Sequence, residues 1–329
     1  MALARRAGPR LDIGCGAAGY EGLGAKDRNR MAWNSDRVSD AFLRALIWLA
    51  RRVPYRTRLR LFGWASGYIV APLGGFITKA ERNLRFIHPD MSRAEARKIA
   101  RRVAINFGRN TIENYCKDEL AEVLRESTIE GPGLADFNAA LAEGRGVLIV
   151  SGHIGNYETL RVAIHNMGHP VAALYRPATN PYFNAHYKTT MESLTGPAFA
   201  QGRQGVIGFT RYVKAGGVGA MLFDVRASQY PDVDFFGHPA PTSTFAAEMP
   251  LKTGALLLPV FTRRCEDGIH HVVHFETPIA ATTPREMTEE MTRRLEARVR
   301  STPDQWLWVH DRWGSEQVRA RRAQGSDNE

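Results

Sequence analysis

Short apolar runs alternate with longer amphipathic segments through the second half of the chain. Such runs of four to six residues, set between polar or glycine-rich segments, are typical of buried strands. The predicted strands cover residues 147–150, 171–175, 219–223, 256–261 and 271–275. The predicted helices cover residues 135–143, 157–167, 181–194, 206–214, 244–253 and 284–300. Because strands that alternate with helices require crossover connections, we expect an α/β fold with helices flanking a mixed, mostly parallel sheet.

The first part of the chain has a different pattern, in which apolar residues form two longer stretches. Residues 41–50 and 61–77 are mostly apolar and include tryptophan and tyrosine. Neither reaches the roughly 20 uninterrupted apolar residues of a membrane-spanning helix, because Arg44 and several glycines interrupt them. We therefore expect a helical segment that lies on a bilayer or dips into it. A pair of core helices with solvated arginines is the alternative.

These patterns divide the chain into four parts. Residues 1–37, rich in Gly, Ala and Arg, are predicted to be a disordered or non-native extension, with Met31 a candidate for the biological start. Residues 38–118 are predicted to be a membrane-associated helical region, and residues 119–315 the α/β domain. Residues 316–329 form a basic polar tail. Within the helical region, Ser92 followed by Glu95 is a capping-box signal that starts a helix ending near residue 116.

Charge narrows the choice of partner. The formal net charge of the 329 residues is +10, which favours an anionic partner such as nucleic acid, anionic lipid or an acidic carrier protein. The arginines between the two apolar stretches, beside tryptophan and tyrosine, fit a membrane interface better than a nucleic-acid groove; they are Arg51, Arg52, Arg56, Arg58 and Arg60. No nucleic-acid recognition motif accompanies the charge. The three cysteines are widely separated, which argues against a disulfide framework or a zinc site.

A glycine-rich segment near the amino terminus, residues 11–19, is similar to the first loop of S-adenosylmethionine-dependent methyltransferases. That loop requires a preceding apolar strand, and residues 1–10 do not supply one. The methyltransferase reading is therefore weak, and a truncation starting at Met31 would test it.

The candidate catalytic residue is His153, in the glycine-rich turn after the predicted strand 147–150. Open α/β sheets bind their ligands at the carboxyl ends of their strands, where this turn lies. Glu158 follows five positions later and could meet His153 only if the histidine precedes the helix and Glu158 lies in its first turn. A carboxylate on one imidazole nitrogen would leave the other free as a general base. A turn histidine beside an unrelated acid is the alternative.

Other polar and aromatic residues follow the later strands. Arg176 comes after the strand 171–175 and suits a phosphate or an oxyanion, although a structural ion pair is equally compatible. Asp224 ends the strand 219–223, and Phe235-Phe236-Gly237 could line an apolar slot or belong to the core.

Two features of the carboxyl-terminal third bear on the fold. Pro259 interrupts a predicted strand, which favours an edge or bulged position. Residues 303–313 combine three tryptophans with His and Arg, a patch suited to an interface or to capping the core.

Taken together, these blocks resemble the bacterial lipid A biosynthesis acyltransferases (lauroyl/myristoyl type), a branch of the lysophospholipid acyltransferase superfamily. The resemblance covers about residues 38–315. The matching blocks are His153 with Glu158, Tyr175–Pro177, Asn180-Pro181, Asp224, Phe235–Gly237, Pro259, residues 305–313, residues 82–85 and His88-Pro89. Val225 and His238 stand where many members carry glutamine and an acidic or small residue, which bears on acceptor or acyl-chain preference.

The resemblance implies a glycerolipid acyltransferase-like fold and an O-acyltransferase that needs no cofactor or metal. A fatty acyl thioester on acyl carrier protein, or on coenzyme A, would be transferred to a hydroxyl of a lipid A precursor. It implies His153 as the base and Glu158 as its partner. The implied substrate-binding residues are Arg176, Asn156, Asp224, Phe235, Phe236 and Gly237, with Asp224 the weaker candidate, for shaping the site.

The implied location is the cytoplasmic face of the cell inner membrane, held peripherally or by a single amino-terminal anchor, with anionic membrane lipid as a further partner and no nucleic acid. Two alternatives remain open. The acceptor could be another membrane lipid, such as a glycerophospholipid, a glycosylated inositol lipid or an aminolipid. A non-catalytic membrane-surface protein is the alternative from another class, and it predicts that loss of His153 changes no phenotype.

Overall fold

The structure is a computed structural model, and it describes residues 25–314, with side chains from residue 36. A seven-stranded sheet has the order β1-β9-β8-β2-β5-β3-β4. Its strands are β1 (Thr128–Glu130), β2 (Val147–Ser151), β3 (Val171–Tyr175), β4 (Ala198–Ala200), β5 (Val218–Leu222), β8 (Leu256–Arg264) and β9 (His271–Phe275). All neighbouring strands are parallel except β8 and β9, which confirms the mixed, mostly parallel sheet flanked by helices.

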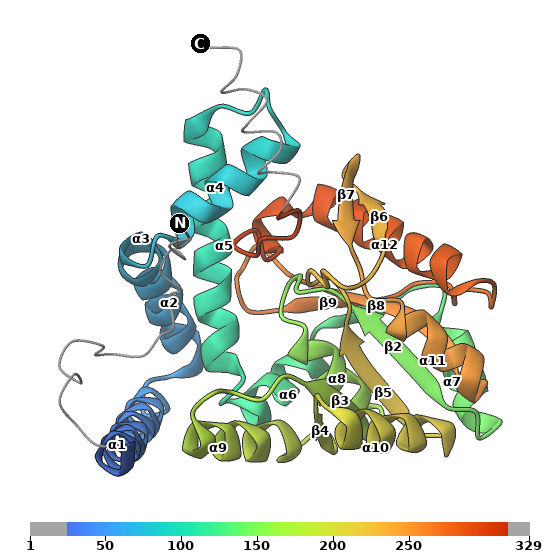
Figure 1. The fold of residues 1–329 in the computed structure, drawn as a ribbon, viewed down its shortest axis with the longest axis horizontal. Helices are drawn as coiled ribbons and strands as arrows, with labels where there is room; N and C mark the ends of the chain where they lie inside the picture. Colours follow the sequence, from blue (N-terminus) through green and yellow to red (C-terminus); the bar gives the residue numbers. More distant parts are fainter. Residues whose placement is uncertain (1–24, 315–329) are drawn as a thin grey trace, which may run out of the picture.

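Helices cover both faces of the sheet. Successive side chains of its central strand point to opposite sides, and because all of them are buried, each face needs a covering layer. Leu148 and Val150 of β2 belong to one hydrophobic cluster, and Val147 and Ile149 belong to the other. The first cluster includes residues from α10 (Arg203–Lys214), α11 (Phe245–Thr253) and α12 (Pro284–Ser301). The second includes residues from α6 (Lys117–Arg125), α7 (Leu134–Ala142) and α8 (Glu158–Asn166). The helix α9 (Pro181–Glu192) leads from β3 to β4 (Figure 1).

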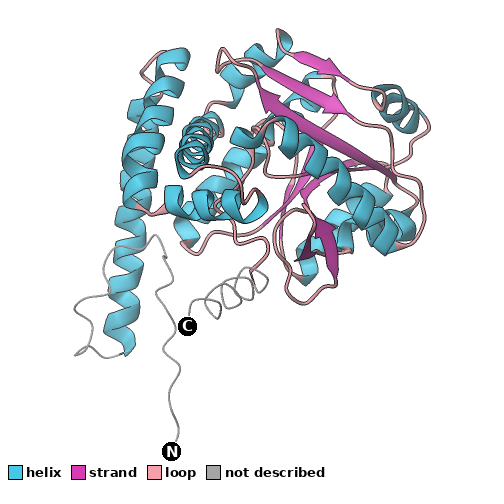
Figure 2. Cartoon of the chain, turned by 90° about the horizontal axis from the view of Figure 1, so that it is seen from above, coloured by secondary structure: helices cyan, strands magenta, loops and turns pink. Residues whose placement is uncertain are grey.

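The amino-terminal helices form a separate layer beside the sheet, and α5 is the member of this layer that lies next to the α/β domain (Figures 1 and 2). They are α1 (Ala25–Ala50), α2 (Tyr55–Ala65), the π-helix η1 (Ser66–Val70), α3 (Ala71–Leu73), α4 (Phe76–Ile87) and α5 (Arg93–Glu113). Ser92 caps α5 by accepting a hydrogen bond from the Glu95 backbone amide, as the sequence predicts. Among the described residues no single helix is long and apolar enough to cross a bilayer, but Tyr55–Leu73 and Phe76–Ile87, bent by 85°, pass that test as a pair.

Several sequence predictions need correction. Residues 25–37, predicted to belong to a disordered or non-native extension, are helical here, because helix α1 begins at Ala25; residues 1–24 and 315–329 lie outside the described part. The segment expected to be a loop before residue 243 contains a hairpin of β6 (Asp232–Phe235) and β7 (His238–Pro241). Its strands are too short to give a clear alternating pattern.

Pro259 lies in a central strand, not at an edge. It ends the pairing of β8 with β2, and the pairing of β8 with β9 begins at Val260. A proline is tolerated at this change of partner because a missing amide does not interrupt a continuous ladder. Arg58 also differs from expectation: it is buried and paired with Glu119, so it does not contribute charge to the surface.

The segment after α12 covers the sheet end rather than forming an exposed patch. It begins with the 3₁₀ helix η2 (Pro303–Gln305), and Trp306, Trp308 and Trp313 are almost completely buried. Of the two readings that the sequence left open, the structure therefore supports core capping. Asn83 on α4 donates hydrogen bonds to the carbonyl oxygens of Trp308 and His310, which fastens this segment to the amino-terminal layer.

Candidate active site

The candidate site lies at the carboxyl ends of β2 and β5, which are neighbours in the sheet. The register aligns Ser151 with Leu222. His153 and Asp224 each follow the aligned residue by two positions, so the strand pairing brings them opposite each other. Residues at this edge of a parallel sheet commonly form ligand sites.

Asp224 holds the His153 imidazole through a direct hydrogen bond. Nδ1 of His153 lies 2.7 Å from Oδ1 of Asp224, and the backbone amide of His153 donates to Oδ2 at 2.8 Å. The indole Nε1 of Trp306 donates to the same Oδ2 at 2.9 Å. Because an ionised carboxylate only accepts hydrogen bonds, Nδ1 carries the proton in the neutral ring and Nε2 keeps its lone pair. The His153 side chain is 25% exposed and Asp224 only 2%, so the imidazole is the accessible member.

The two groups shift each other's pKa in opposite directions. Burial lowers the pKa of His153, but the charge and hydrogen bond of Asp224 raise it, and the net shift is upward. Burial raises the pKa of Asp224, but His153 and Trp306 lower it to about 2. Asp224 is therefore ionised at neutral pH. His310, which lies near the pair, has a pKa lowered by burial, and its Nε2 accepts a hydrogen bond from the Arg226 amide at 2.8 Å.

The predicted contact between Glu158 and His153 is wrong in this structure. The Glu158 carboxylate pairs with Arg161 at 3.0 Å and with the Lys117 ammonium at 3.4 Å. Glu158 is the first residue of α8, and its carboxylate contacts Lys117, the first residue of α6. All three groups are buried, and burial, which would raise the pKa of Glu158, is outweighed by the two cations, which lower it. Glu158 is thus the anion of a buried ion cluster.

Two glycines allow the turn between β2 and α8 to pack closely. A β-carbon at Gly152 would lie 2.7 Å from a Leu295 methyl and 3.1 Å from Asp224 Oδ2. Gly155 has φ of +60°, and a β-carbon there would lie 2.2 Å from the carbonyl oxygen of Thr262. Side chains rarely adopt that backbone conformation, and the contact with Thr262 excludes one altogether.

The predicted substrate-binding residues fall into three environments. Arg176 is exposed after β3, at the same sheet end as His153. Asn156 is 1% exposed; its amide donates to Glu113 Oε2 at 2.7 Å and its oxygen accepts from the Glu158 amide at 3.1 Å. Its polar atoms are bonded within the protein, so the prediction that Asn156 contacts substrate needs correction. Asp224 is likewise buried, and its carboxylate binds His153, so it acts on the site through the histidine.

The aromatic pair is part of the core. Phe235 is fully buried and stacks on Trp313 with ring centroids 5.7 Å apart, so it does not line an open slot. Phe236 is 6% exposed and has a positive φ of 61°, with the Arg300 guanidinium 4.7 Å from its ring centroid. Gly237, with φ of +77°, is exposed in the hairpin turn. For Phe236 and Gly237, contact with substrate stays a prediction.

Some residues of the site have no counterpart in the sequence-based expectation. The sequence indicates only that Trp306 belongs to an aromatic patch, but its indole Nε1 donates a hydrogen bond to the Asp224 carboxylate. Asn110 and Glu113 bind the turn that carries His153, and Arg264 binds both of them. The sequence carries no clear signal for Arg264, because it is the last residue of β8 and lies three positions beyond the predicted end of that strand. In the described part of the chain no three His, Cys, Asp or Glu side chains cluster in a way that could hold a metal ion.

The fold and this geometry define the class of protein: an α/β enzyme with an accessible histidine, backed by a buried carboxylate, at the carboxyl ends of parallel strands. A family model described as bacterial lipid A biosynthesis acyltransferase matches residues 34–315, and the chain belongs to this family. It is therefore an O-acyltransferase that transfers an acyl group to a lipid, and the family is one of lipid A biosynthesis.

Two individual proteins are similar to the chain. A lipid A biosynthesis acyltransferase from Haemophilus influenzae is 24% identical over 265 residues, which covers 78% of this chain and 81% of that protein. The crystal structure of the 1-acyl-sn-glycerophosphate (LPA) acyltransferase PlsC from Thermotoga maritima covers 76% of this chain and 99% of its own at 14% identity. Its TM-score of 0.37 is too low to support an argument about either fold or function.

Proposed function

We propose that this enzyme transfers a fatty acyl chain from an acyl thioester to a hydroxyl of a lipid A precursor, with His153 as the general base. The acyl donor is a thioester on acyl carrier protein, with coenzyme A as the alternative carrier. The observation that carries the proposal is the hydrogen bond between His153 Nδ1 and Asp224, because it leaves the lone pair of Nε2 available on a side chain that is 25% exposed. Family membership supplies the lipid acceptor.

The proposed reaction proceeds without an acyl-enzyme. Nε2 of His153 takes the proton of the acceptor hydroxyl while the hydroxyl oxygen attacks the carbonyl carbon of the thioester. The tetrahedral intermediate that forms carries a negative charge on the former carbonyl oxygen, and it collapses with cleavage of the carbon–sulfur bond. The imidazolium then returns its proton to the leaving thiolate, which yields the ester and the free thiol. Asp224 stabilises the imidazolium between these two steps.

Arg176 is the candidate for an anionic group of the substrates. It lies after β3, which pairs with β5, so it shares the sheet end with His153 and Asp224. A guanidinium suits either a phosphate of the acceptor or the oxyanion of the intermediate, because its donors form a planar fork. The two assignments differ in their kinetics. Loss of a phosphate contact raises KM for the acceptor, whereas loss of oxyanion stabilisation lowers kcat.

We also propose that the amino-terminal helices bind the cytoplasmic face of the inner membrane. In the described part of the chain, twelve of the fifteen exposed large apolar side chains lie between residues 38 and 107. Examples are Trp64, 55% exposed, and Leu73, 84% exposed. Exposed arginines, including Arg52 and Arg56, lie beside them and suit anionic headgroups. An enzyme held there would meet its lipid acceptor in the bilayer.

The decisive experiment is an acyl-transfer assay with wild type, His153→Ala and a control, His165→Ala on α8. The donors are acyl carrier protein loaded with chains of several lengths, and the acceptor is a tetra- or penta-acylated lipid A precursor. A general base contributes about 10²- to 10⁴-fold to the rate, so His153→Ala should lose that factor in kcat. His165→Ala should keep wild-type activity.

Transfer by His153→Ala at the wild-type rate would contradict the role of His153. Failure of the wild-type enzyme on every lipid A precursor would redirect the search to glycerophospholipid or other membrane-lipid acceptors. Lipid extracts of a deletion strain distinguish these cases, because a missing secondary chain on lipid A changes its mass.

A further inference from the structure

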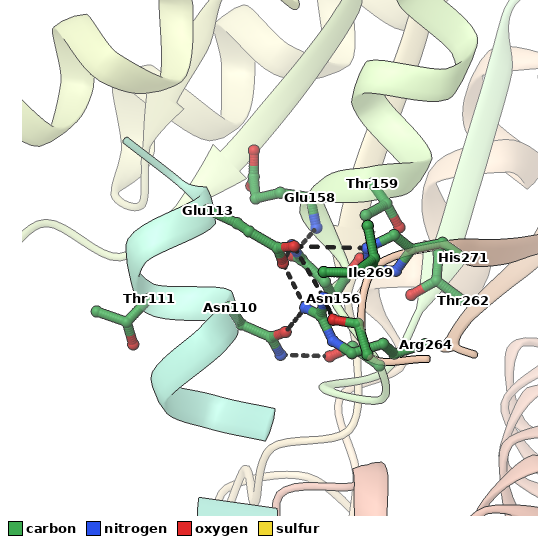
Figure 3. Close-up of polar contacts among 12 residues, drawn as sticks. Asn110, Thr111, Glu113, Asn156, Glu158, Thr159, Thr262, Arg264, Ile269 and His271 are labelled. Atoms are coloured by element: carbon green, nitrogen blue, oxygen red, sulfur yellow. Dashed lines mark hydrogen bonds and ion pairs between the residues drawn. The ribbon is translucent and has the colours of Figure 1, made fainter. Parts of the chain in front are cut away.

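Two side chains of helix α5, in the amino-terminal layer, form hydrogen bonds with the turn that carries His153 (Figure 3). The side-chain amide of Asn110 donates to the carbonyl oxygen of Gly155 at 2.6 Å. Oε2 of Glu113 accepts from the amide of Asn156 at 2.7 Å. Two successive residues of the turn are therefore bound by two residues of α5 that lie about one helical turn apart.

Arg264 of β8 binds both of these α5 residues (Figure 3). Its guanidinium forms a bidentate ion pair with Glu113, with Nη1 2.8 Å from Oε1, and its Nη2 donates to Asn110 Oδ1 at 2.8 Å. Tyr55 donates its hydroxyl to Glu113 Oε1 at 2.9 Å. Glu113 is 0% and Arg264 3% exposed, so neither can contact substrate. A buried bidentate pair of this kind holds its partners in one geometry.

The contacts continue from Asn156 along the turn. The side-chain Oδ1 of Asn156 accepts from the Glu158 amide at 3.1 Å, and its backbone carbonyl oxygen accepts from the Thr159 hydroxyl at 2.6 Å, so Asn156 is bonded to the first turn of α8. On the other side, the Gly155 amide donates to the Gln305 carbonyl at 3.0 Å. The turn is held between α5 and the segment that carries Trp306, the residue that binds Asp224.

We propose that Asn110 and Glu113 are positioning residues that set the location of His153 by clamping Gly155 and Asn156 to α5. Helix α5 packs against α2 and η1, which carry part of the exposed apolar surface, so the clamp also links the catalytic turn to the surface proposed above to bind the membrane. This inference rests on the proposed role of His153 as base. A reacting group displaced by about 1 Å can cost about 100-fold in rate, so the effect belongs in kcat.

The first test compares Asn110→Ala with a matched control, Asn166→Ala. Asn166 lies at the far end of α8 and likewise donates one amide hydrogen bond to a backbone carbonyl, that of Ala121, at 2.9 Å. In the acyl-transfer assay Asn110→Ala should lose about 10- to 100-fold in kcat with KM for both substrates within about twofold. Asn166→Ala should match wild type in both constants.

A double-mutant cycle tests whether Glu113 acts through Asn156. Glu113→Gln leaves Arg264 without its counter-charge, so thermal unfolding is measured alongside and kcat is expressed per folded molecule. If Glu113 acts through Asn156, then Glu113→Gln, Asn156→Ala and the double variant should lose similar factors in kcat. Additive losses, in which the double variant loses the product of the two factors, would overturn this route.

The outcomes separate the inference from the proposed function. If His153→Ala loses transfer while Asn110→Ala and Asn156→Ala keep wild-type kcat, the clamp is structural only and the inference fails alone. A change confined to KM, or an equal loss in Asn166→Ala, overturns it as well. If His153→Ala retains wild-type kcat, the proposed function fails, and the inference fails with it.

Discussion

Two buried carboxylates next to the catalytic turn, Asp224 and Glu158, have different partners and therefore different chemistry. Asp224 binds the imidazole of His153, while Glu158 binds the cations of Lys117 and Arg161. A carboxylate can raise the pKa of a histidine only by lying near it, so Asp224 is the one that tunes the base. Glu158 instead neutralises two cations that would otherwise be buried without a counter-charge.

Replacement of Asp224 by Asn should move the acid limb of the kcat–pH profile to lower pH. The base acts when it is neutral, and Asp224 raises the pKa of His153. Without that charge, burial remains as the main influence and lowers the pKa, so the neutral form persists to lower pH. Among the groups near His153, Tyr157 and His310 are unchanged in this variant. The maximal kcat should also fall, because the imidazolium loses its stabilising charge.

The measurement is the pH dependence of single-turnover acyl transfer for wild type, Asp224→Asn and a control, Asp136→Asn on α7. The control should keep the wild-type limb. An Asp224→Asn limb that coincides with that of wild type would show that this carboxylate does not tune the base.

Replacement of Glu158 by Gln should act on stability instead. Removing one member of a buried ion cluster costs about 3–5 kcal/mol of unfolding free energy, because Lys117 and Arg161 lose their counter-charge. The folded pKa of Glu158 lies below its ordinary value of 4.5, so its contribution is present above that pH and is lost as the pH falls through the folded pKa.

Urea unfolding of both proteins between pH 4 and pH 7 checks this expectation. The difference in unfolding free energy should be largest near neutral pH and shrink toward acid, while the pH limb of kcat per folded molecule stays in place. A displaced limb with unchanged stability would return Glu158 to the role that the sequence suggested.

At the scale of elements, the geometry of the turn between β2 and α8 depends on glycine at one position for two separate reasons. Gly155 has a positive φ, and its α-carbon faces the Thr262 carbonyl across the turn. Gly144 has a similar positive φ of +68°, but nothing lies within 4 Å of a β-carbon placed there. A comparison of these two glycines therefore distinguishes the cost of a positive φ, which both have, from the cost of a steric clash, which only Gly155 has.

Alanine at each of these glycines should give different results. Both variants incur the left-handed backbone strain, about 1–2 kcal/mol. Only Gly155→Ala must also displace backbone, and it should lose more stability together with about 100-fold in kcat as the turn shifts His153. Thermal unfolding and the transfer assay measure both effects. Equal behaviour of the two variants would mean that the turn accommodates a β-carbon without moving the base.

At the scale of the whole molecule, the amino-terminal helices present an apolar surface that the α/β domain does not cover. Helix α1 carries exposed Val38, Phe42, Leu46 and Leu49, whose spacing places them along one side of the helix. Such a concentration of exposed apolar groups marks an interaction surface rather than an ordinary solvated face. Together with the neighbouring arginines it fits a bilayer with anionic headgroups.

Replacing Trp64 and Leu73 together by Ser should weaken binding to phosphatidylglycerol-containing vesicles by about 100-fold or more. The change leaves the charge constant and removes apolar area, worth about 1.5–3 kcal/mol for each side chain that is fully buried on binding. The control replaces Ile207 and Leu251 by Ser, two exposed apolar residues on α10 and α11. Vesicle co-sedimentation measures both variants, and equal loss in the control would place the lipid contact elsewhere.

The pattern of residues along the chain predicts the longer strands and helices of this protein but not its shortest strands. The apolar runs and the Ser92 cap predicted the main strands and α5, because strand burial and helix capping depend on residues close in sequence. The short strands β1, β4, β6 and β7 escaped prediction because three or four residues carry too little periodicity.

The sequence by itself determined that His153 ends a core strand and that carboxylates are available to it. Which carboxylate binds it was decided by the order of the sheet, since β5 follows β3 in the chain yet pairs with β2. The partner of His153 therefore lies 71 residues away rather than five. Glu113 and Arg264, 151 residues apart, meet because the fold brings the end of α5 to the end of β8. Buried charges select partners by proximity in the folded core, and spacing along the chain does not encode that proximity.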